Sequence, residues 1–249
     1  IVHIGSGAFH RAHQAVYTDD ALTADGGDWR ITGVSLRGTE IADALNPQDG
    51  RYTLLERGAA GTKARIIGSI ASVISATRDS AGVMQALTNR ATRIVSLTVT
   101  EKAYGIDRAT GGIDVEHQAI AHDIAKPRNP VGVIGFIVES LRQRRSLGLP
   151  AYTVLCCDNL PENGKITRSG VLDFAMRLDK GLRDWIAAEV AFPCTMVDRI
   201  TPASTAKTLS DTEALVGAID MAAVETEPFS ECVIEDNFPQ GRPAWEAGV

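Results

Sequence analysis

The stretch that most constrains the fold of this chain is its first thirteen residues, IVHIGSGAFHRAH. An apolar run ends in a Gly-x-Gly turn at Gly5 and Gly7, and a segment with helical character follows at once. This order is typical of a Rossmann unit, in which the glycine turn and the helix N-terminus hold a pyrophosphate. His10 stands in the place of the third glycine of that pattern, so a purely structural turn between a strand and a helix remains an equal alternative.

Length and composition place the chain among ordinary globular proteins. Its 249 residues are enough to bury a substantial core, and 44% of them are hydrophobic and 22% charged. A net charge of −6 argues against a nucleic-acid or anionic membrane surface, and no apolar run approaches the ~18 residues of a membrane span. We therefore expect neither nucleic acid nor a membrane among its partners, and no signal peptide is visible.

The cysteines and histidines follow neither a disulfide nor a metal pattern. Cys156 and Cys157 are neighbours and no C-x-x-C motif occurs, which suits the reduced thiols of a cytoplasmic protein. His10 and His13, three residues apart on a predicted helix, could face one metal ion, but a catalytic zinc site needs a third protein ligand. The other histidines are scattered, so we expect no metal. The two histidines would instead hydrogen-bond the glycine turn or face solvent.

Strand and helix patterns alternate along most of the chain. Strands are predicted at residues 29–36, 52–56, 64–74, 93–100, 151–157, 192–201 and 232–235, the second and third forming a hairpin. Helices are predicted at residues 8–22, 80–90, 130–147, 165–177 and 180–190, with a loop of little regular structure at 107–130 and a segment of open type at 216–224. The alternation predicts one α/β domain over residues 1–249, Rossmann-type and doubly wound, with a mostly parallel sheet and helices on both faces.

Four polar clusters fall at the predicted carboxyl ends of strands. They are Gly5–Gly7, Glu101–Lys102, Asp158–Asn159 and Asp198–Arg199. In doubly wound sheets, ligands bind beyond the carboxyl ends of the strands. The coincidence therefore predicts that these clusters form the rim of a single active site.

Each cluster has a chemical and a structural interpretation. Asn159 is a donor suited to orienting a substrate oxygen or an oxyanion, or it forms the turn that follows its strand. Asp198 and Arg199 could bind a polyol or sugar-acid chain, or pair with each other. Lys102 could act as a general acid, but pairing with Glu101 to shape the loop against the cofactor is favoured, because nothing indicates a desolvated amine.

The end of the second predicted strand bears on the cofactor. Dinucleotide folds carry an acid there for the adenosine ribose, whereas this chain has Arg37-Gly38-Thr39-Glu40. Arg37 could lie over an adenine or meet a 2′-phosphate. A solvated loop arginine is an equal alternative.

Five stretches carry a family resemblance. IVHIGSGAFHRAHQAVY, TVTEKAY, CCDNLPENG, FPCTMVDRITP and VIEDNFPQGRP resemble, in this order and spacing, the long-chain mannitol dehydrogenase family of polyol and sugar-acid dehydrogenases. The segment from Val190 to Pro202 matches the signature stretch of that family. Within the family, the residues of these stretches are most similar to those of the fructuronate reductases, also called D-mannonate oxidoreductases.

The resemblance implies a Rossmann-type domain that binds NAD(H) and uses no metal. It implies hydride transfer between nicotinamide and the C2 carbonyl or alcohol of a sugar acid (fructuronate or mannonate), with mannitol or another polyol as the alternative. It also implies that Asn159 helps to hold the reacting oxygen and that Asp198, with Arg199 beside it, lines the substrate site. The predicted cofactor-binding residues are Gly5, Gly7, Ala8, Phe9, His10, Arg11, Ala12, Arg37, Glu101 and Lys102.

Two departures from the family pattern matter. Ala103 stands where the family usually has glycine. The family's catalytic lysine lies beyond the VIEDxFxxGRPxW stretch, so we expect the helical C-terminal catalytic domain to be a missing partner and residues 1–249 alone to be inactive. Its absence should expose an apolar patch near residues 238–245. A non-catalytic dinucleotide-binding module is the alternative of another class.

Overall fold

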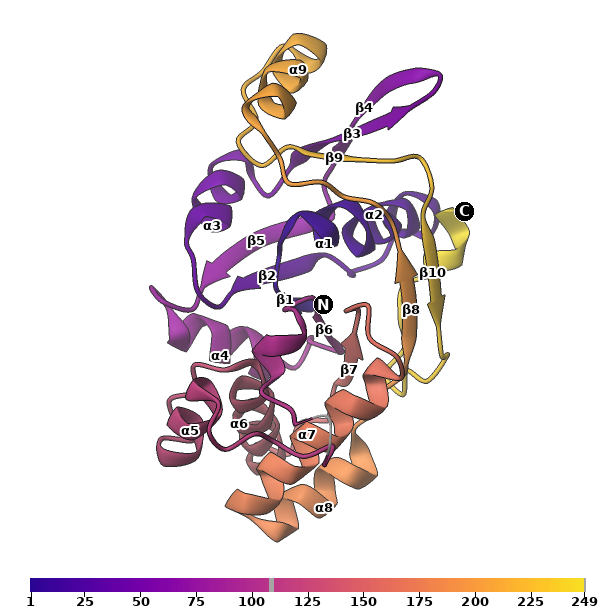
Figure 1. Cartoon of the computed structure of the whole chain (residues 1–249). Helices are drawn as coiled ribbons and strands as arrows, with labels where there is room; N and C mark the ends of the chain where they lie inside the picture. The colour runs from indigo at the N-terminus through magenta and orange to yellow at the C-terminus, as the bar shows by residue number, and fades with distance from the viewer. Residues whose placement is uncertain (108–109, 249) are drawn as a thin grey trace.

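The computed structural model describes residues 1–107 and 110–248, and its centre is a five-stranded sheet whose neighbouring strands are all parallel (Figure 1). In spatial order the strands are β5 (Ile70–Ser75), β2 (Ile31–Ser35), β1 (Val2–Ile4), β6 (Ile94–Leu97) and β7 (Thr153–Cys156). Renumbered along the chain within this sheet, that order is 3-2-1-4-5, the Rossmann order up to its fifth strand. The predicted α/β, Rossmann-type sheet is confirmed.

The strands β1, β6 and β7 are buried along their whole length because both of their faces are covered. Side chains alternate across a strand, so Val154 and Cys156 of β7 enter one core while Leu155 and Cys157 enter the other. The first core is closed by α4 (Ser80–Thr88), α6 (Val133–Ser146) and α7 (Asn163–Leu178). The second is closed by α2 (Gln14–Asp25) and α3 (Glu40–Leu45), on the opposite face of the sheet (Figure 1).

The remaining helical elements are shorter or peripheral. They are α1 (Ala8–Ala12), α5 (Gln118–Ala125), α8 (Lys180–Glu189), α9 (Ala206–Val216) and the 3₁₀ turns η1 (Asn46–Gln48), η2 (Glu101–Tyr104) and η3 (Trp245–Gly248). None of the helices in the described parts of the chain is both long and apolar enough to cross a lipid bilayer.

A small second sheet contains the predicted hairpin. β3 (Tyr52–Gly58) and β4 (Gly61–Ile67) pair antiparallel, and β9 (Val224–Thr226) lies parallel to β3. The single strand predicted at 64–74 is wrong, because the chain leaves β4 at Gly68 and enters the main sheet as β5. Asp19 and Ala15 of α2 fix this crossing: the Gly68 N–H donates to Asp19 Oδ1 (2.8 Å) and the Ser69 hydroxyl to the Ala15 carbonyl (2.7 Å).

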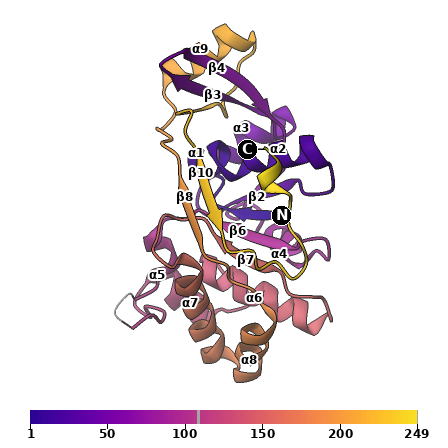
Figure 2. The ribbon, with the colours of Figure 1, turned by 90° about the vertical axis from the view of Figure 1, so that its right-hand side faces the viewer.

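A two-stranded ribbon runs along the edge of the domain. β8 (Thr195–Asp198) and β10 (Glu231–Ile234) pair antiparallel and pass from the lower helices to the second sheet (Figure 2). Strands were predicted at both places, with longer bounds at 192–201. The segment 216–224, whose type was open, ends α9 and then runs as a loop into β9.

Three further expectations need correction. The helix predicted at 8–22 is two helices, broken at His13 (φ −125°, ψ −96°). The loop predicted at 107–130 contains α5, and its residues 108–109 lie outside the described residues. Helix α9 was not predicted, although Thr205 and Thr208 form a capping box at its start.

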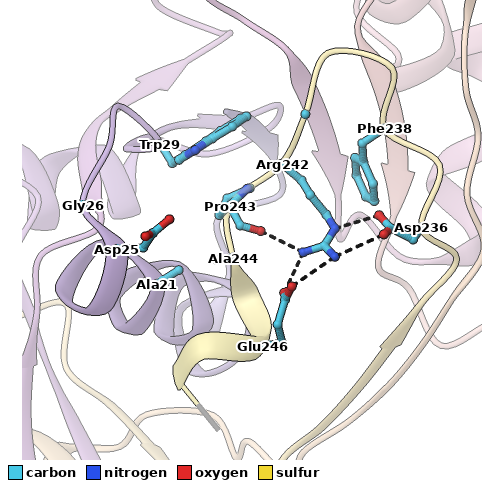
Figure 3. A pocket seen from close by; sticks show the side chains of 11 residues that line it. Ala21, Asp25, Gly26, Trp29, Asp236, Phe238, Arg242, Pro243, Ala244 and Glu246 are labelled. Carbon is cyan, nitrogen blue, oxygen red and sulfur yellow. Dashed lines mark hydrogen bonds and ion pairs between the residues drawn. The ribbon is translucent and has the colours of Figure 1, made fainter.

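The C-terminal segment does not expose the expected apolar patch. Phe238 and Trp245 pack edge to face with ring centroids 5.8 Å apart, and the Trp245 indole donates to Thr18 Oγ1 on α2 (3.1 Å). Arg242 is bound by the carboxylates of Asp236 (2.8 Å) and Glu246 (2.6 Å), as Figure 3 shows. The Trp245 hydrogen bond attaches the segment to α2, and the other contacts hold the segment together. Exposed apolar side chains lie elsewhere, including Met196 and Val233 on the β8–β10 ribbon.

Candidate functional site

The turn after β1 is built for glycine at its first position. Gly5 has a φ of +103°, and its N–H donates to the Val34 carbonyl (2.8 Å). A Cβ on Gly5 would lie closer than 3.0 Å to the Thr98 carbonyl, a separation that real Cβ atoms essentially never show. Gly7 differs, since the nearest atom to a Cβ there would be 3.8 Å away. The backbone at Gly7 is therefore open to close approach by a ligand.

Helix α1 offers its first N–H groups to the same space. Because the helix begins at Ala8, the N–H groups of Ala8, Phe9 and His10 have no acceptor within the helix. At five residues, α1 is much shorter than the predicted helix, so its macrodipole is small. Individual N–H groups are the feature suited to binding an anion here.

Two adjoining pockets form one groove over the strand ends, which we call the strand-end groove. Gly5, Gly7, Thr98 and Thr100 line both pockets, whose volumes are about 270 and 420 Å³. The smaller pocket is further lined by Ser6, Ser35, Leu36, Arg37, Gly38, Ile41, Val99 and Ala103. The larger is further lined by Ala8, Phe9, His10, Cys157, Asp158, Asn159, Val197, Asp198 and Arg199. The groove lies at the topological switch point, where doubly wound sheets bind ligands.

The groove brings together most of the predicted site residues. Arg37 lies at one end and Asn159 and Asp198 at the other, with the glycine turn between them. Four predicted cofactor-binding residues are not among the described residues that line it: Arg11, Ala12, Glu101 and Lys102. Arg11 and Ala12 are buried behind the turn, and Glu101 and Lys102 are exposed on η2. Their cofactor roles stay predictions.

Asp158 holds the ends of β6 and β7 together. Its carboxylate accepts hydrogen bonds from the N–H groups of Val99 (3.1 Å) and Thr100 (3.2 Å) and from the Tyr104 hydroxyl (2.7 Å). Thr100 has a φ of +74°, a strained conformation for a residue with a side chain. The sequence placed Asp158 in a cluster but indicated no such role, because its partners are about 55 residues away.

Asn163 makes the hydrogen bonds of the turn after β7. Its amide donates to the carbonyls of Cys156 and Asp158 (both 3.0 Å) and accepts from the Thr195 N–H (2.9 Å). Asn159 is exposed in the groove, and none of the described residues hydrogen-bonds its side chain. Because Asn163, and not Asn159, makes hydrogen bonds within the turn, a ligand-binding role for Asn159 is favoured over a role in forming the turn.

A stacked histidine pair lies beneath the glycine turn. The rings of His3 and His10 are 3.4 Å apart and nearly parallel. His3 bonds the hydroxyls of Ser96 and Thr98 (both 2.8 Å), whereas neither ring nitrogen of His10 has a partner among the described residues. Burial lowers the pKa of His3 to about 3 and that of His10 well below its usual value. Both rings are therefore neutral at pH 7.

His13 is buried as well, and none of the described contacts joins His10 or His13 to the glycine turn by a hydrogen bond, so both alternatives predicted for these histidines are wrong. Its Nε2 bonds the Glu231 carbonyl of β10 (2.9 Å), and its ring stacks on Phe9. Burial again lowers the pKa of His13. Within residues 1–107 and 110–248, no three His, Cys, Asp or Glu side chains are grouped to hold a metal ion.

These buried histidines should make the fold sensitive to mild acid. Below pH 6.5 the unfolded chain protonates both histidines, whereas in the folded chain the pKa of His3 is about 3 and that of His10 is well below its usual value, so stability falls as the pH falls. From pH 7 to pH 5 His3 should remove about 2 kcal/mol of unfolding free energy, measured by urea denaturation, and His10 should add to that loss. His10→Phe keeps an aromatic stack without a titrating group, and it should reduce the loss of unfolding free energy between pH 7 and pH 5. An unchanged pH profile in this variant would contradict the account.

Glu40 lies beside Gly38 of the strand-end groove and was not among the predicted cofactor-binding residues. Its carboxylate folds back over Gly38 at the end of β2, so closely that a Cβ on Gly38 would clash with it. The sequence does show an acid shortly after the second strand, which could have identified Glu40, but Arg37 is nearer to the end of the strand. Glu40 brings a negative charge to the position where dinucleotide folds bind the adenosine ribose.

Comparison with known proteins places this geometry in a family. A family model described as the mannitol dehydrogenase Rossmann domain matches residues 1–247. The chain belongs to the mannitol dehydrogenase family. The likeness is global, since this mannitol dehydrogenase Rossmann domain superposes on Pseudomonas fluorescens mannitol 2-dehydrogenase, solved as a ternary complex with NAD and D-mannitol, with a TM-score of 0.94. The two are 45% identical, over 98% of this chain and 51% of that one.

Two curated relatives are about equally similar to this mannitol dehydrogenase domain. The D-mannonate oxidoreductase of Escherichia coli is 46% identical over 99% of the chain and 51% of the relative. The mannitol 2-dehydrogenase of Cereibacter sphaeroides is 45% identical over 99% of the chain and 52% of the relative. The chain thus spans about half the length of the curated relatives it matches.

Proposed function

We propose that this chain is the cofactor domain of an NAD-dependent oxidoreductase. In the proposed reaction, hydride passes between nicotinamide and the C2 carbonyl or alcohol of a sugar acid such as fructuronate or mannonate. The observation that supports the proposal most is the strand-end groove, which joins the glycine turn at Gly5 to the polar side chains of Asn159 and Asp198. A polyol is the second candidate, because the mannitol 2-dehydrogenases are nearly as similar as the D-mannonate oxidoreductase.

The residues of the groove fit a dinucleotide. The open backbone at Gly7 and the N–H groups of Ala8 and Phe9 would hold the pyrophosphate. NADH would supply the hydride for reduction of the carbonyl, and NAD would accept it in the reverse direction. Arg37 and Glu40 would flank the adenosine end.

The opposite end of the groove would orient the substrate. The Asn159 amide would donate a hydrogen bond to the reacting oxygen and stabilise the negative charge that develops on it. The Asp198 carboxylate would accept a hydrogen bond from a substrate hydroxyl. Lys102 does not line the groove, so we propose that the proton donor comes from the rest of the complete protein, in a second, C-terminal domain.

Oxidation of NADH by the complete protein tests the proposal. The assay compares fructuronate with fructose at matched concentrations. A higher kcat/KM with fructuronate supports the sugar-acid assignment, and a higher value with fructose supports the polyol alternative. Binding of NADH without oxidation by either substrate would leave the chain a non-catalytic dinucleotide-binding module.

NADH should bind more tightly than NADPH. A 2′-phosphate at the end of β2 would meet the Glu40 carboxylate over Gly38, and like charges brought together in a site weaken binding. We expect the Kd of NADPH to exceed that of NADH by about tenfold or more, measured by fluorescence titration. In Arg37→Ala, NADH should still bind more tightly than NADPH. In Glu40→Gln, the difference between the two Kd values should become smaller. Tighter binding of NADPH, reversed by Arg37→Ala, would instead make Arg37 a phosphate ligand.

A further inference from the structure

Arg199 follows Asp198 at the end of β8, and its guanidinium turns away from solvent into the protein. Its side chain is 4% exposed. Nη1 donates to the Ala12 carbonyl (2.7 Å), while Nη2 and Nε both donate to the Glu227 carbonyl (3.1 and 3.3 Å). The Glu56 carboxylate lies 3.5 Å from Nη2. These hydrogen bonds commit the guanidinium to the protein itself, although the residue lines the groove.

The Ala12 carbonyl lies at the C-terminus of α1 and accepts no hydrogen bond from within the helix. The break at His13 stops α1 after one turn, so its last carbonyls lack helical partners. The Tyr52 hydroxyl binds the Arg11 carbonyl (2.5 Å) and Arg199 binds that of Ala12. The C-terminus of α1 is therefore capped by side chains from β3 and from the end of β8.

The other side of Arg199 is the turn that carries Asp198. The Ile200 N–H donates to the Glu227 carboxylate (2.7 Å), and the Thr226 hydroxyl donates to the Ile200 carbonyl (2.9 Å). With the guanidinium on the Glu227 carbonyl, these bonds fix the backbone that follows Arg199, and the pairing of Asp198 with Glu231 of β10 fixes the backbone before it. Asp198 is thereby held at a set position in the groove.

We propose that Arg199 is a positioning residue that sets the spacing between α1, which carries the cofactor-facing N–H groups, and Asp198. The inference rests on the proposed function. A planar guanidinium can donate in two directions at once, from Nη1 to one carbonyl and from Nε and Nη2 to another, which a lysine ammonium cannot reproduce. A buried cation is costly unless hydrogen-bonded, so these carbonyls are what make its burial tolerable.

Arg199→Lys in the complete protein tests the inference. The substitution keeps the positive charge but removes the planar guanidinium that donates in two directions, so the spacing between α1 and Asp198 should no longer be fixed. We expect the Kd of NADH to rise about tenfold and kcat to fall at least as much. The matched control is Arg144→Lys, which alters another buried arginine bonded to carbonyls, those of Leu87, Asn89 and Pro150, away from the groove. It should lower Tm without changing the Kd of NADH.

Chemical rescue separates positioning from general destabilisation. Arg199→Ala should bind NADH weakly and should regain affinity when millimolar guanidinium is added, whereas Arg144→Ala should show no such gain. An unchanged Kd and kcat in Arg199→Lys, or equal losses in both lysine variants, would overturn the inference. If Arg199→Ala does not fold, the comparison of Arg199→Lys with Arg144→Lys decides whether the inference holds. Failure of the wild-type protein to bind NADH would instead refute the proposed function, and the inference with it.

Discussion

Replacing Gly5 with alanine should destabilise the folded chain by about 3 kcal/mol, combining backbone strain with overpacking. The φ of +103° is a conformation that alanine rarely adopts, and the new Cβ would strike the Thr98 carbonyl of the neighbouring strand end. That carbonyl cannot yield easily, because Thr98 is anchored to Ile4 by its own N–H (3.0 Å). The loss should appear as a lower midpoint in urea denaturation at unchanged slope.

Gly7→Ala is the matched variant, and its expected effect is different. Its φ is −69° and a Cβ finds open space, so the cost in stability should be at most about 1 kcal/mol. The new methyl group would occupy the space that a pyrophosphate needs, so the Kd of NADH should rise by about tenfold or more. Wild-type stability in Gly5→Ala would contradict the described turn. Wild-type affinity in Gly7→Ala would mean that the cofactor phosphates bind elsewhere.

Asn159→Ala should lower kcat of the complete protein by about 10²-fold or more, the usual cost of losing one donor to a developing oxyanion. The Kd of NADH should not change, because the side chain lies at the substrate end of the groove. Tm should not change either, since Asn163 makes the hydrogen bonds of the turn. Asp198→Ala should show the same pattern of lost turnover and retained cofactor affinity.

Asn163→Ala is the contrasting control for Asn159. Asn163 is buried, and its loss removes the hydrogen bonds that its amide makes with the Cys156 carbonyl, the Asp158 carbonyl and the Thr195 N–H, so Tm should fall markedly. Activity measured below the lowered Tm separates the two asparagines. A kcat close to wild type in Asn159→Ala would remove that residue from the proposed mechanism.

The main sheet was predictable because its strands obey a local rule. Apart from His3, Ser96 and Thr153, β1, β6 and β7 are short apolar runs, as is typical of strands buried on both faces, and the glycine turn marks where the first one ends. The prediction of one strand at 64–74 was wrong because it used the same local pattern. The β-branched run of that segment is continuous, and the switch between sheets at Gly68 depends on Asp19, about fifty residues earlier.

The candidate site was predictable in outline but not in its internal contacts. The carboxyl ends of β1 and β7 lie at one edge of the main sheet, so the meeting of Gly7 and Asn159 followed from topology. Asp198 reaches the groove on β8, which lies outside that sheet and pairs with β10. The guanidinium of Arg199 could not be oriented from sequence, because its partners lie on α1 and beside β9. The His3–His10 stack was likewise hidden, since it joins a strand to a helix across the turn.

The most direct test of the central claim uses residues 1–249 alone, titrated with NADH and then assayed for NADH oxidation with fructuronate and with fructose. We expect weak binding of NADH and no oxidation above background, because the groove holds the proposed cofactor-binding groups but not the proposed proton donor. The complete protein should oxidise NADH under the same conditions. Failure of residues 1–249 to bind NADH would contradict the assignment of the groove. Clear turnover by them would place proton transfer within this chain, with Lys102 as the first residue to substitute.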